Sequence, residues 1–182
     1  VEKDREFYEE SGGGITLSGG EVLQQHAFAV ELLKEAQSRG LHCAAETTGY
    51  ASHEVFREFV EYIDLLLFDM KHWDREKHFE KTGVYNDIIL ENMGYAVSQG
   101  IPLIARIPVI PKFNASLKDA AGMAENLCKL GIREVHLLPF HQFGEKKYEQ
   151  LETEYEMSGV PQLHPEQLQK YIQVFLDRGL DA

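Results

Sequence analysis

Apolar positions along this chain recur in two patterns, one typical of helices and one typical of strands. Spacings of three and four residues predict amphipathic helices, and short apolar runs between them predict buried strands. The predicted helices cover residues 22–39, 52–62, 86–99, 116–130 and 165–178, after the end of an incoming helix at 1–11. The predicted strands cover residues 14–18, 41–47, 65–70, 102–109 and 134–138. Residues 140–163 have no clear period and contain glycine and proline, so we expect a long loop there.

Strands and helices alternate five times, without the turn signals of hairpins between them. This order predicts right-handed strand–helix–strand units and a parallel sheet, which is an α/β fold. Ser116 and Asp119 have the spacing of a capping box, and Pro165 suits the first turn of the last helix. No repeat, low-complexity tract or linker interrupts the pattern, so we expect residues 1–182 to form a single domain.

Charge and hydropathy limit the partners that the chain can have. A net charge of -12 and a pI of about 5.1 argue against nucleic acid or an anionic membrane as a partner. The longest apolar run, residues 63–70, is interrupted by Asp64 and Asp69 and is too short to span a bilayer. No signal peptide is visible at the N-terminus, and we therefore expect a cytoplasmic protein.

The chain has two cysteines, Cys43 and Cys128, and eight histidines. Two cysteines do not make a disulfide framework, and reduced thiols in the cytosol are the simpler account. Each cysteine falls on an apolar stretch, so we expect both side chains to pack in the core. The histidines show no metal-ligand spacing with other histidines, cysteines or acidic residues, and a zinc site held by the protein is not expected.

A glycine-rich stretch, Ser11–Gln25, surrounds the first predicted strand. Gly19 and Gly20 form a bare turn after that strand, and Glu21 follows at the start of a helix. Glycine lets the backbone take positive φ or approach another group closely, so this turn suits the amino or polar end of a ligand. A tight turn without any ligand is the alternative. The stretch lacks the lysine of a Walker loop and the spacing of a dinucleotide fingerprint.

A titratable residue stands at the end of every predicted strand. These residues are Glu21, Glu46, Asp69 with Lys71, Arg106 and His141. Because parallel strands place their carboxyl ends at one edge, we expect these side chains to gather at one mouth, where ligands of such folds bind. The mixed signs suit a zwitterionic ligand with sugar hydroxyls better than a phosphate, which favours cations.

Each of these residues also has a purely structural interpretation. Asp69 and Lys71 share a strand face and can pair with each other, while Arg106 can bridge Glu46 or Asp69. His141 can be a core histidine. Lys71 at a strand end also allows a Schiff-base enzyme, although a neighbouring carboxylate favours the charged ammonium. A binding domain without catalysis is a further alternative.

Taken together, the segments resemble the radical S-adenosylmethionine activating enzymes of glycyl radical enzymes, the pyruvate formate-lyase activating enzyme family. The matching segments cover nearly the whole chain in family order. They are Ser18–Glu21 with Gln25, Glu46–Tyr50, Asp69–Lys71, Thr82 with Gly83, Ile89–Asn92, Arg106–Pro111 with Asn114, and Leu138–His141 with Gly144, Lys147 and Tyr148.

The resemblance implies a partial (β/α) barrel that holds a [4Fe-4S] cluster and S-adenosylmethionine. In such oxidoreductases the reduced cluster cleaves the sulfonium to methionine and a 5′-deoxyadenosyl radical. The radical then takes a Cα hydrogen from one glycine of a partner enzyme such as pyruvate formate-lyase. The resemblance also implies a small electron-donor protein, flavodoxin or ferredoxin, as a partner.

The resemblance further assigns cofactor contacts at the mouth. The implied contacts to S-adenosylmethionine are Gly19, Gly20 and Glu21 at the amino group, then Asp69, Met70 and Lys71 toward the ribose and carboxylate, with Arg106 and His141 completing the pocket. The implied ligands of a monovalent cation are Glu46, Thr47 and Asp69.

The chain departs from the family at its cluster-binding loop. The family's Cys-x-x-x-Cys-x-x-Cys motif is absent, and Cys43 and Cys128 are misplaced to replace it. Five strands are predicted where the family has six, so we expect the C-terminal part of a longer protein, inactive by itself. Val22 and Lys112 stand where proline and glycine are common in the family.

Overall fold

The computed structural model describes residues 2–142 and 157–182. Its sheet has five strands, all parallel and adjacent in chain order. The strands are β1 (Gly14–Leu17), β2 (His42–Thr47), β3 (Leu65–Asp69), β4 (Leu103–Val109) and β5 (Glu134–Pro139). The predicted parallel α/β fold is therefore confirmed, and the strands fall within two residues of the predicted bounds.

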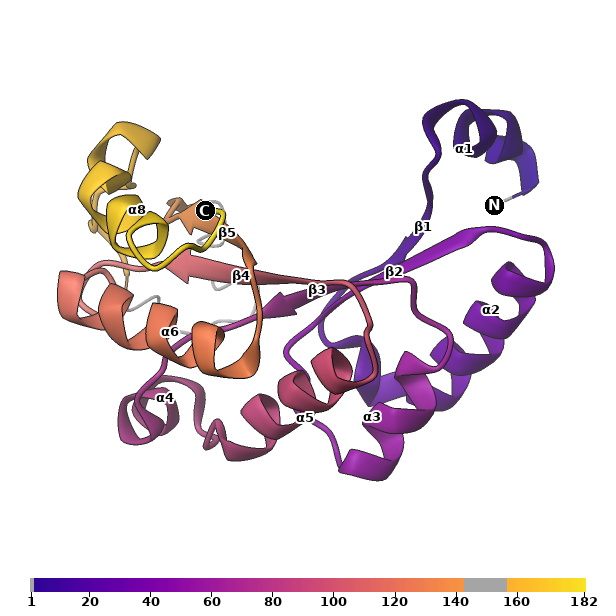
Figure 1. Cartoon of the computed structure of the whole chain (residues 1–182), viewed down its shortest axis with the longest axis horizontal. Helices are drawn as coiled ribbons and strands as arrows, with labels where there is room; N and C mark the ends of the chain where they lie inside the picture. Colours follow the sequence, from indigo (N-terminus) through magenta and orange to yellow (C-terminus); the bar gives the residue numbers. More distant parts are fainter. Residues whose placement is uncertain (1, 143–156) are drawn as a thin grey trace.

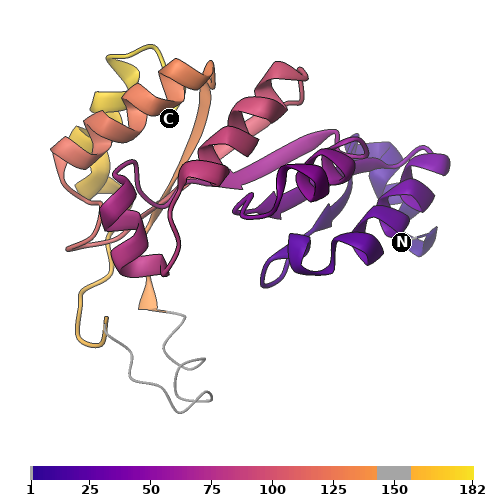
Figure 2. The ribbon, with the colours of Figure 1, turned by 90° about the horizontal axis from the view of Figure 1, so that it is seen from below.

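Helices connect successive strands and lie along one side of the curved sheet (Figure 1). The α-helices are α1 (Arg5–Ser11), α2 (His26–Ser38), α3 (His53–Val60), α4 (Arg75–Thr82), α5 (Asp87–Ser98), α6 (Leu117–Leu130) and α8 (Gln169–Leu176). Short 3-10 segments are η1 (Glu2–Asp4), η2 (Val22–Gln25) and η4 (Pro165–Leu168). Seen from below, helices lie along the outer face of the sheet toward both of its ends, and strands are visible between them (Figure 2).

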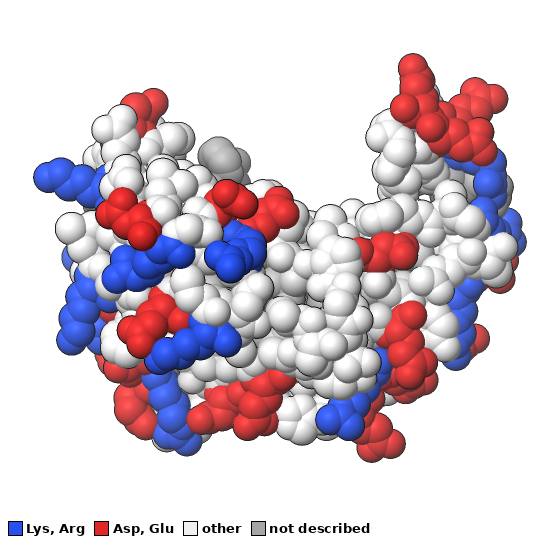
Figure 3. All heavy atoms as spheres, in the orientation of Figure 1, with Lys and Arg blue, Asp and Glu red and all other residues white. Residues whose placement is uncertain are grey.

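The opposite side of the molecule is hollowed between the two ends of the sheet (Figure 3). This shape is a partial barrel, because the sheet curves but does not close. Acidic side chains gather on the arm at the N-terminal end, over α1 (Figure 3). Among the described residues, no helix combines the length and apolar character that a bilayer crossing needs.

The core lies between the sheet and the outer helices. In β3, Leu66 and Phe68 are fully buried, and Phe68 meets Phe56 of α3 with ring centroids 6.0 Å apart. Leu67 and Asp69 alternate with them and are only partly buried. Because side chains alternate along a strand, packing the apolar set against the helices turns Asp69 toward the hollow.

The structure differs from the sequence prediction at three helices. The helix predicted at residues 165–178 begins as the 3-10 segment η4, and its α-helical part α8 covers Gln169–Leu176. The predicted helix at residues 22–39 begins as the 3-10 turn η2, because the Glu21 carboxylate accepts the Leu23 N–H and tightens the turn. Helix α4 was missed, since it is polar and short. Its ends carry a signal that could have revealed it: Asp74 caps the first turn at 3.0 Å from Lys77 N, and Gly83 ends the helix with φ 76°.

The two cysteines have different environments. Cys43 is fully buried in β2, as predicted, and burial raises the pKa of its thiol to about 11. The prediction of a core position is wrong for Cys128, which is exposed on α6 and donates to the Arg178 carbonyl. The family-like positions Gly144, Lys147 and Tyr148 lie outside the described residues.

Candidate functional site: the mouth at the strand ends

Four charged side chains from three strand ends meet at the mouth of the hollow. Arg106 Nη1 lies 2.5 Å from Glu46 Oε1, and Arg106 Nε lies 3.9 Å from Asp69 Oδ1. Lys71 Nζ lies 3.1 Å from Asp69 Oδ2. The register explains the cluster, because Asp69 pairs with Arg106 across β3 and β4. Two carboxylates and two cations thus form a neutral row, which we call the charged row.

The charged row is half-buried, and its members are satisfied by one another. The side chains keep between 22% and 37% of their surface exposed. The structural interpretation let Lys71 pair with Asp69 and Arg106 bridge Glu46 or Asp69. In this structure Lys71 pairs with Asp69, and Arg106 contacts both carboxylates. Such pairs exchange partners readily because solvent screens them, so an incoming ligand can compete for them.

Glu21 is held by β2 and by the chain that follows it. Its Oε1 accepts from Thr47 Oγ1 at 2.6 Å and from Leu23 N at 3.2 Å. Its Oε2 accepts the backbone N–H of Thr48 at 2.8 Å and the Thr48 hydroxyl. With both oxygens engaged, this carboxylate fixes the position of the glycine turn before it.

The glycine turn itself is open. Gly19 has φ 139°, and a Cβ built on Gly19 or Gly20 would meet nothing within 4 Å. Ser18 beside it donates to Glu46 Oε2 at 2.9 Å, which ties the turn to the charged row. The turn therefore leaves space for a ligand to approach the backbone closely.

The predicted cation ligands are only partly brought together. Glu46 and Asp69 both face Arg106, so their carboxylates share one region. Thr47 is 4% exposed and its hydroxyl donates to Glu21. Neighbouring residues of a strand point to opposite faces, which separates the Thr47 side chain from the two carboxylates. A bound cation stays a prediction.

Two further residues that were predicted to contact the cofactor, Met70 and His141, lie outside the charged row. Met70 is 2% exposed and packs in the core, while its backbone N–H donates to the Arg106 carbonyl at 2.8 Å. His141 is exposed just beyond β5, so it is not a core histidine. Their contacts to a cofactor stay predictions.

A cavity of about 270 Å³ opens beside the charged row. Asp69, Lys71 and Glu21 line it together with Thr48, Tyr50 and Gln24 of the neighbouring loops. His78 and Thr82 of α4 line it as well, with Val84 and Ile89. Sequence reasoning did not identify His78, because the helix that carries it was not predicted.

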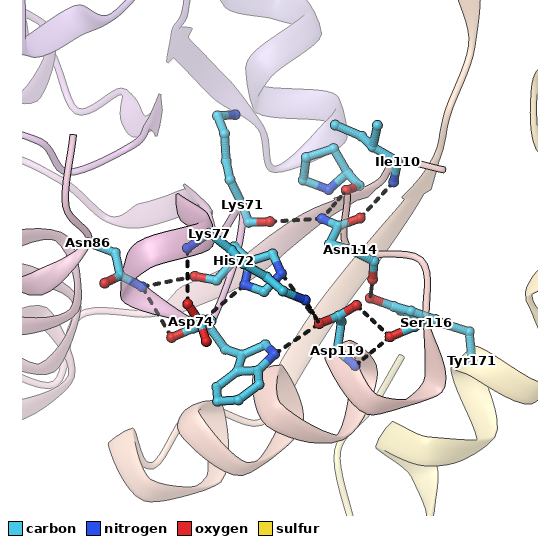
Figure 4. A network of polar contacts seen from close by, with 12 residues as sticks. Lys71, His72, Asp74, Lys77, Asn86, Ile110, Asn114, Ser116, Asp119 and Tyr171 are labelled. Carbon is cyan, nitrogen blue, oxygen red and sulfur yellow. Dashed lines mark hydrogen bonds and ion pairs between the residues drawn. The ribbon is translucent and has the colours of Figure 1, made fainter. Parts of the chain in front are cut away.

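Asn114 fixes the backbone next to the mouth through the polar network shown in Figure 4. It is fully buried, and its Nδ2 donates to the carbonyls of Lys71 and Pro108, both at 2.8 Å. Its Oδ1 accepts the Ile110 N–H at 2.7 Å, and its own carbonyl accepts from Tyr171 Oη at 3.0 Å. One side chain therefore joins the chain after β3 to the chain after β4.

Asp119 anchors the other half of the same network (Figure 4). Its carboxylate accepts from Ser116 Oγ at 2.5 Å, Lys77 Nζ at 3.2 Å and Trp73 Nε1 at 3.3 Å. Burial acts to raise the pKa of Asp119, but these donors outweigh burial and the pKa lies below its usual value. Asp119 is thus ionised, and Ser116 with Asp119 forms the predicted helix cap.

His72 faces that carboxylate. Its Nδ1 accepts the Asp74 N–H at 2.9 Å, so Nε2 carries the hydrogen and lies 3.4 Å from Asp119 Oδ1. The residue is 1% exposed, and burial lowers its pKa although Asp119 acts in the opposite direction. His72 therefore contributes a neutral N–H to a buried cluster behind the mouth.

Comparisons with known proteins place this geometry in a family. The 4-hydroxyphenylacetate decarboxylase activating enzyme of Clostridioides difficile strain CD196 is 42% identical over 172 residues, which are 93% of this chain and 54% of that protein. The choline trimethylamine-lyase activating enzyme of Oleidesulfovibrio alaskensis is 41% identical over 174 residues, 93% of this chain and 56% of that protein. The chain thus spans about half the length of these curated relatives.

A solved structure of the same kind of enzyme matches this chain over nearly the whole length of the solved domain. A domain of pyruvate-formate lyase-activating enzyme from Bacteroides vulgatus superposes with a TM-score of 0.76 and 31% identity, covering 93% of this chain and 97% of that domain. No family model matches the sequence. The motif order, the partial parallel barrel and these relatives agree: the chain belongs to the radical S-adenosylmethionine activating enzymes of glycyl radical enzymes.

Proposed function

We propose that this chain is the part of a radical S-adenosylmethionine activating enzyme that binds the cofactor and receives the glycine of a partner enzyme. The observation that carries the proposal is the charged row, whose two carboxylates and two cations stand half-exposed beside an open glycine turn. A zwitterionic amino acid end needs both signs within reach, and this row supplies them without a net charge.

The chain's own residues fit the cofactor in this way. The Arg106 guanidinium can donate two parallel hydrogen bonds to a ligand carboxylate once its ion pair with Glu46 opens. The open backbone at Gly19 and Gly20 faces the amino end, and Glu21 holds that turn in place. Asp69 and Lys71 line the adjoining cavity and offer an acceptor and a donor to polar groups there. When bound, S-adenosylmethionine supplies the 5′-deoxyadenosyl group that abstracts the glycine hydrogen in this family.

The residues present do not fit an iron–sulfur cluster. Three thiolates are needed in one loop, whereas the chain has only Cys43 and Cys128. Cys43 is buried with a raised pKa and Cys128 lies on a different element, α6. We therefore assign no redox step to these residues, and the activity we propose is that of the whole protein.

The partner we propose is a glycyl radical enzyme of the kind named for the relatives, with flavodoxin or ferredoxin as electron donor. A Schiff-base function for Lys71 is disfavoured, because the Asp69 carboxylate 3.1 Å away stabilises the charged ammonium over the free amine. A domain that only binds S-adenosylmethionine is the second candidate, favoured by the cysteine count.

Two measurements test the proposal. Isothermal titration of the chain with S-adenosylmethionine should show binding, and its absence would count against both candidates. The coding sequence upstream of Val1 should then be read for a Cys-x-x-x-Cys-x-x-Cys motif. With that motif, the longer protein should form 5′-deoxyadenosine anaerobically and give a glycyl signal in electron paramagnetic resonance on choline trimethylamine-lyase or 4-hydroxyphenylacetate decarboxylase. Without the motif, the binding-only candidate is correct.

A further inference from the structure

His78 is a buried histidine that the proposed cofactor contacts do not use. It lies in α4, is 3% exposed, and borders the cavity that Asp69 and Lys71 also line. The cavity therefore has charged residues of the strand ends and, from α4 and the chain after it, the uncharged residues Thr82, Val84 and Ile89. What His78 presents to this space depends on which ring nitrogen carries the hydrogen.

The contacts of Nδ1 settle that question. Nδ1 lies 2.7 Å from the carbonyl oxygen of Val84, and a carbonyl can only accept, so Nδ1 carries the hydrogen. The Thr82 hydroxyl lies 2.9 Å from the same nitrogen and donates to the His78 carbonyl at 2.7 Å, which leaves its oxygen free to accept. In the neutral ring Nε2 is then a hydrogen-bond acceptor with its lone pair available.

Nε2 has no hydrogen-bond partner among the described residues. Among the described residues, one buried side-chain polar atom lacks both a hydrogen-bond partner and accessible surface, and that atom is His72 Nε2. His78 Nε2 therefore keeps contact with the cavity that its side chain borders. A buried acceptor that meets only a cavity is free to bind a donor from a ligand.

We propose that His78 Nε2 accepts a hydrogen bond from a main-chain N–H of the polypeptide substrate that enters this cavity. The inference rests on the proposed function, because a partner's glycine segment must reach the mouth. The wall of the cavity that His78 shares with Val84 and Ile89 suits an uncharged polar group. The other two side chains are apolar, and Nε2 offers an acceptor without a formal charge. Tyr50, which is 43% exposed, also lines the cavity, so part of the cavity wall lies at the molecular surface.

The charged ends of the cofactor have a better place on the other side of the cavity. Asp69 and Lys71 supply opposite charges there, whereas α4 contributes none to the lining. The cofactor as occupant of the His78 wall is thus the competing outcome, and the experiment must separate the two.

The test uses His78→Asn in the 182-residue chain. The asparagine amide takes the place of Nδ1–H and keeps a donor toward the Val84 carbonyl, but it removes the acceptor at Nε2. His53→Asn is the control for the exchange itself, because His53 Nδ1 also lies 2.8 Å from a protein oxygen, Asn92 Oδ1, while its Nε2 pairs with Glu91 and does not line the cavity. Nitrogen-15 spectra of the His78 ring should first show hydrogen on Nδ1, and hydrogen on Nε2 overturns the proposal.

Binding is then measured for S-adenosylmethionine by titration calorimetry and for choline trimethylamine-lyase and 4-hydroxyphenylacetate decarboxylase by biolayer interferometry. His78→Asn should weaken lyase or decarboxylase binding about tenfold, the loss expected when a buried N–H loses its acceptor, with cofactor affinity unchanged. If His78→Asn weakens only cofactor binding, the cofactor occupies the His78 wall and the proposal is overturned. If it changes neither affinity, the proposal is overturned as well. If neither enzyme binds the unaltered chain, the proposed function fails and this inference with it.

Discussion

The charged row and the buried polar network of Asn114 and Asp119, which we call the brace, hold polar groups in opposite ways. In the charged row, Arg106 and Asp69 keep 22% and 28% of their side-chain surface exposed, and their ion pairs join them to Glu46, to Lys71 and to each other. In the brace, Asn114 and Asp119 are almost completely buried, and each makes at least three hydrogen bonds. Polar groups that can exchange partners suit a ligand, whereas saturated buried groups fix the geometry.

The comparison separates stability from binding. Loss of a brace residue should lower the free energy of unfolding, because it leaves buried groups without partners. Loss of a residue in the charged row should change the affinity for a zwitterion more than the stability, because solvent replaces the lost contact. The two regions are joined through Lys71, whose carbonyl belongs to the brace and whose ammonium belongs to the row.

The largest effect is expected for Asp119→Ala. The change leaves the donors of Ser116, Trp73 and His72 facing a cavity, and buried groups that lose a charged partner cost about 3 kcal/mol. Urea unfolding followed by circular dichroism measures this loss. Glu125→Ala is the control, since its pair with Lys129 is exposed and should contribute less than about 0.5 kcal/mol. Equal losses in both variants would show that the brace is not a stabilising unit.

Asn114→Ala should lower stability somewhat less, by about 2 kcal/mol. It removes three hydrogen bonds to the backbone, but these bonds join neutral groups, which contribute less than the bonds that the Asp119 carboxylate accepts. Urea unfolding gives the loss, and Asn126→Ala on α6 serves as the asparagine control. If the brace sets the mouth, S-adenosylmethionine affinity at a temperature where the variant is folded should also fall, which a purely structural role would leave unchanged.

Arg106→Lys probes the charged row. The lysine keeps the charge but loses the planar fork, so S-adenosylmethionine affinity should fall about tenfold. The free energy of unfolding should change by less than about 1 kcal/mol, because the contacts with Glu46 and Asp69 are half-exposed. Arg57→Lys, at an arginine that stacks on Tyr95, is the matched control. A large loss of stability with intact affinity would place Arg106 in the brace rather than the row.

The sequence predicts the frame of this molecule better than its contacts. Periodicity located all five strands, and the strand ends identified Glu46, Asp69, Lys71 and Arg106, which the structure joins. It left open whether Arg106 pairs with Glu46 or with Asp69, because register between strands depends on packing of the whole sheet. His78 was missed for a local reason: eight mostly polar residues give no amphipathic signal.

The smallest effect is expected at Lys112, which stands where glycine is common in the family. A substitution there tests why the family has glycine at this position. Lys112 is the single described residue other than glycine with a positive φ, 64°, and it lies between β4 and the brace residue Asn114. A side chain in the left-handed region costs about 1–2 kcal/mol, and the freedom that glycine adds to the unfolded chain cancels part of the gain. Lys112→Gly should therefore stabilise the protein by about 0.5–1 kcal/mol in urea unfolding.

Lys118→Gly in the first turn of α6 is the control, because there glycine relieves no strain and should destabilise by up to about 1 kcal/mol. Opposite signs for the two variants would attribute the family's glycine to backbone conformation rather than to ligand contact. If Lys112→Gly instead left stability unchanged and altered S-adenosylmethionine affinity, the segment between β4 and Asn114 would belong to the charged row in function.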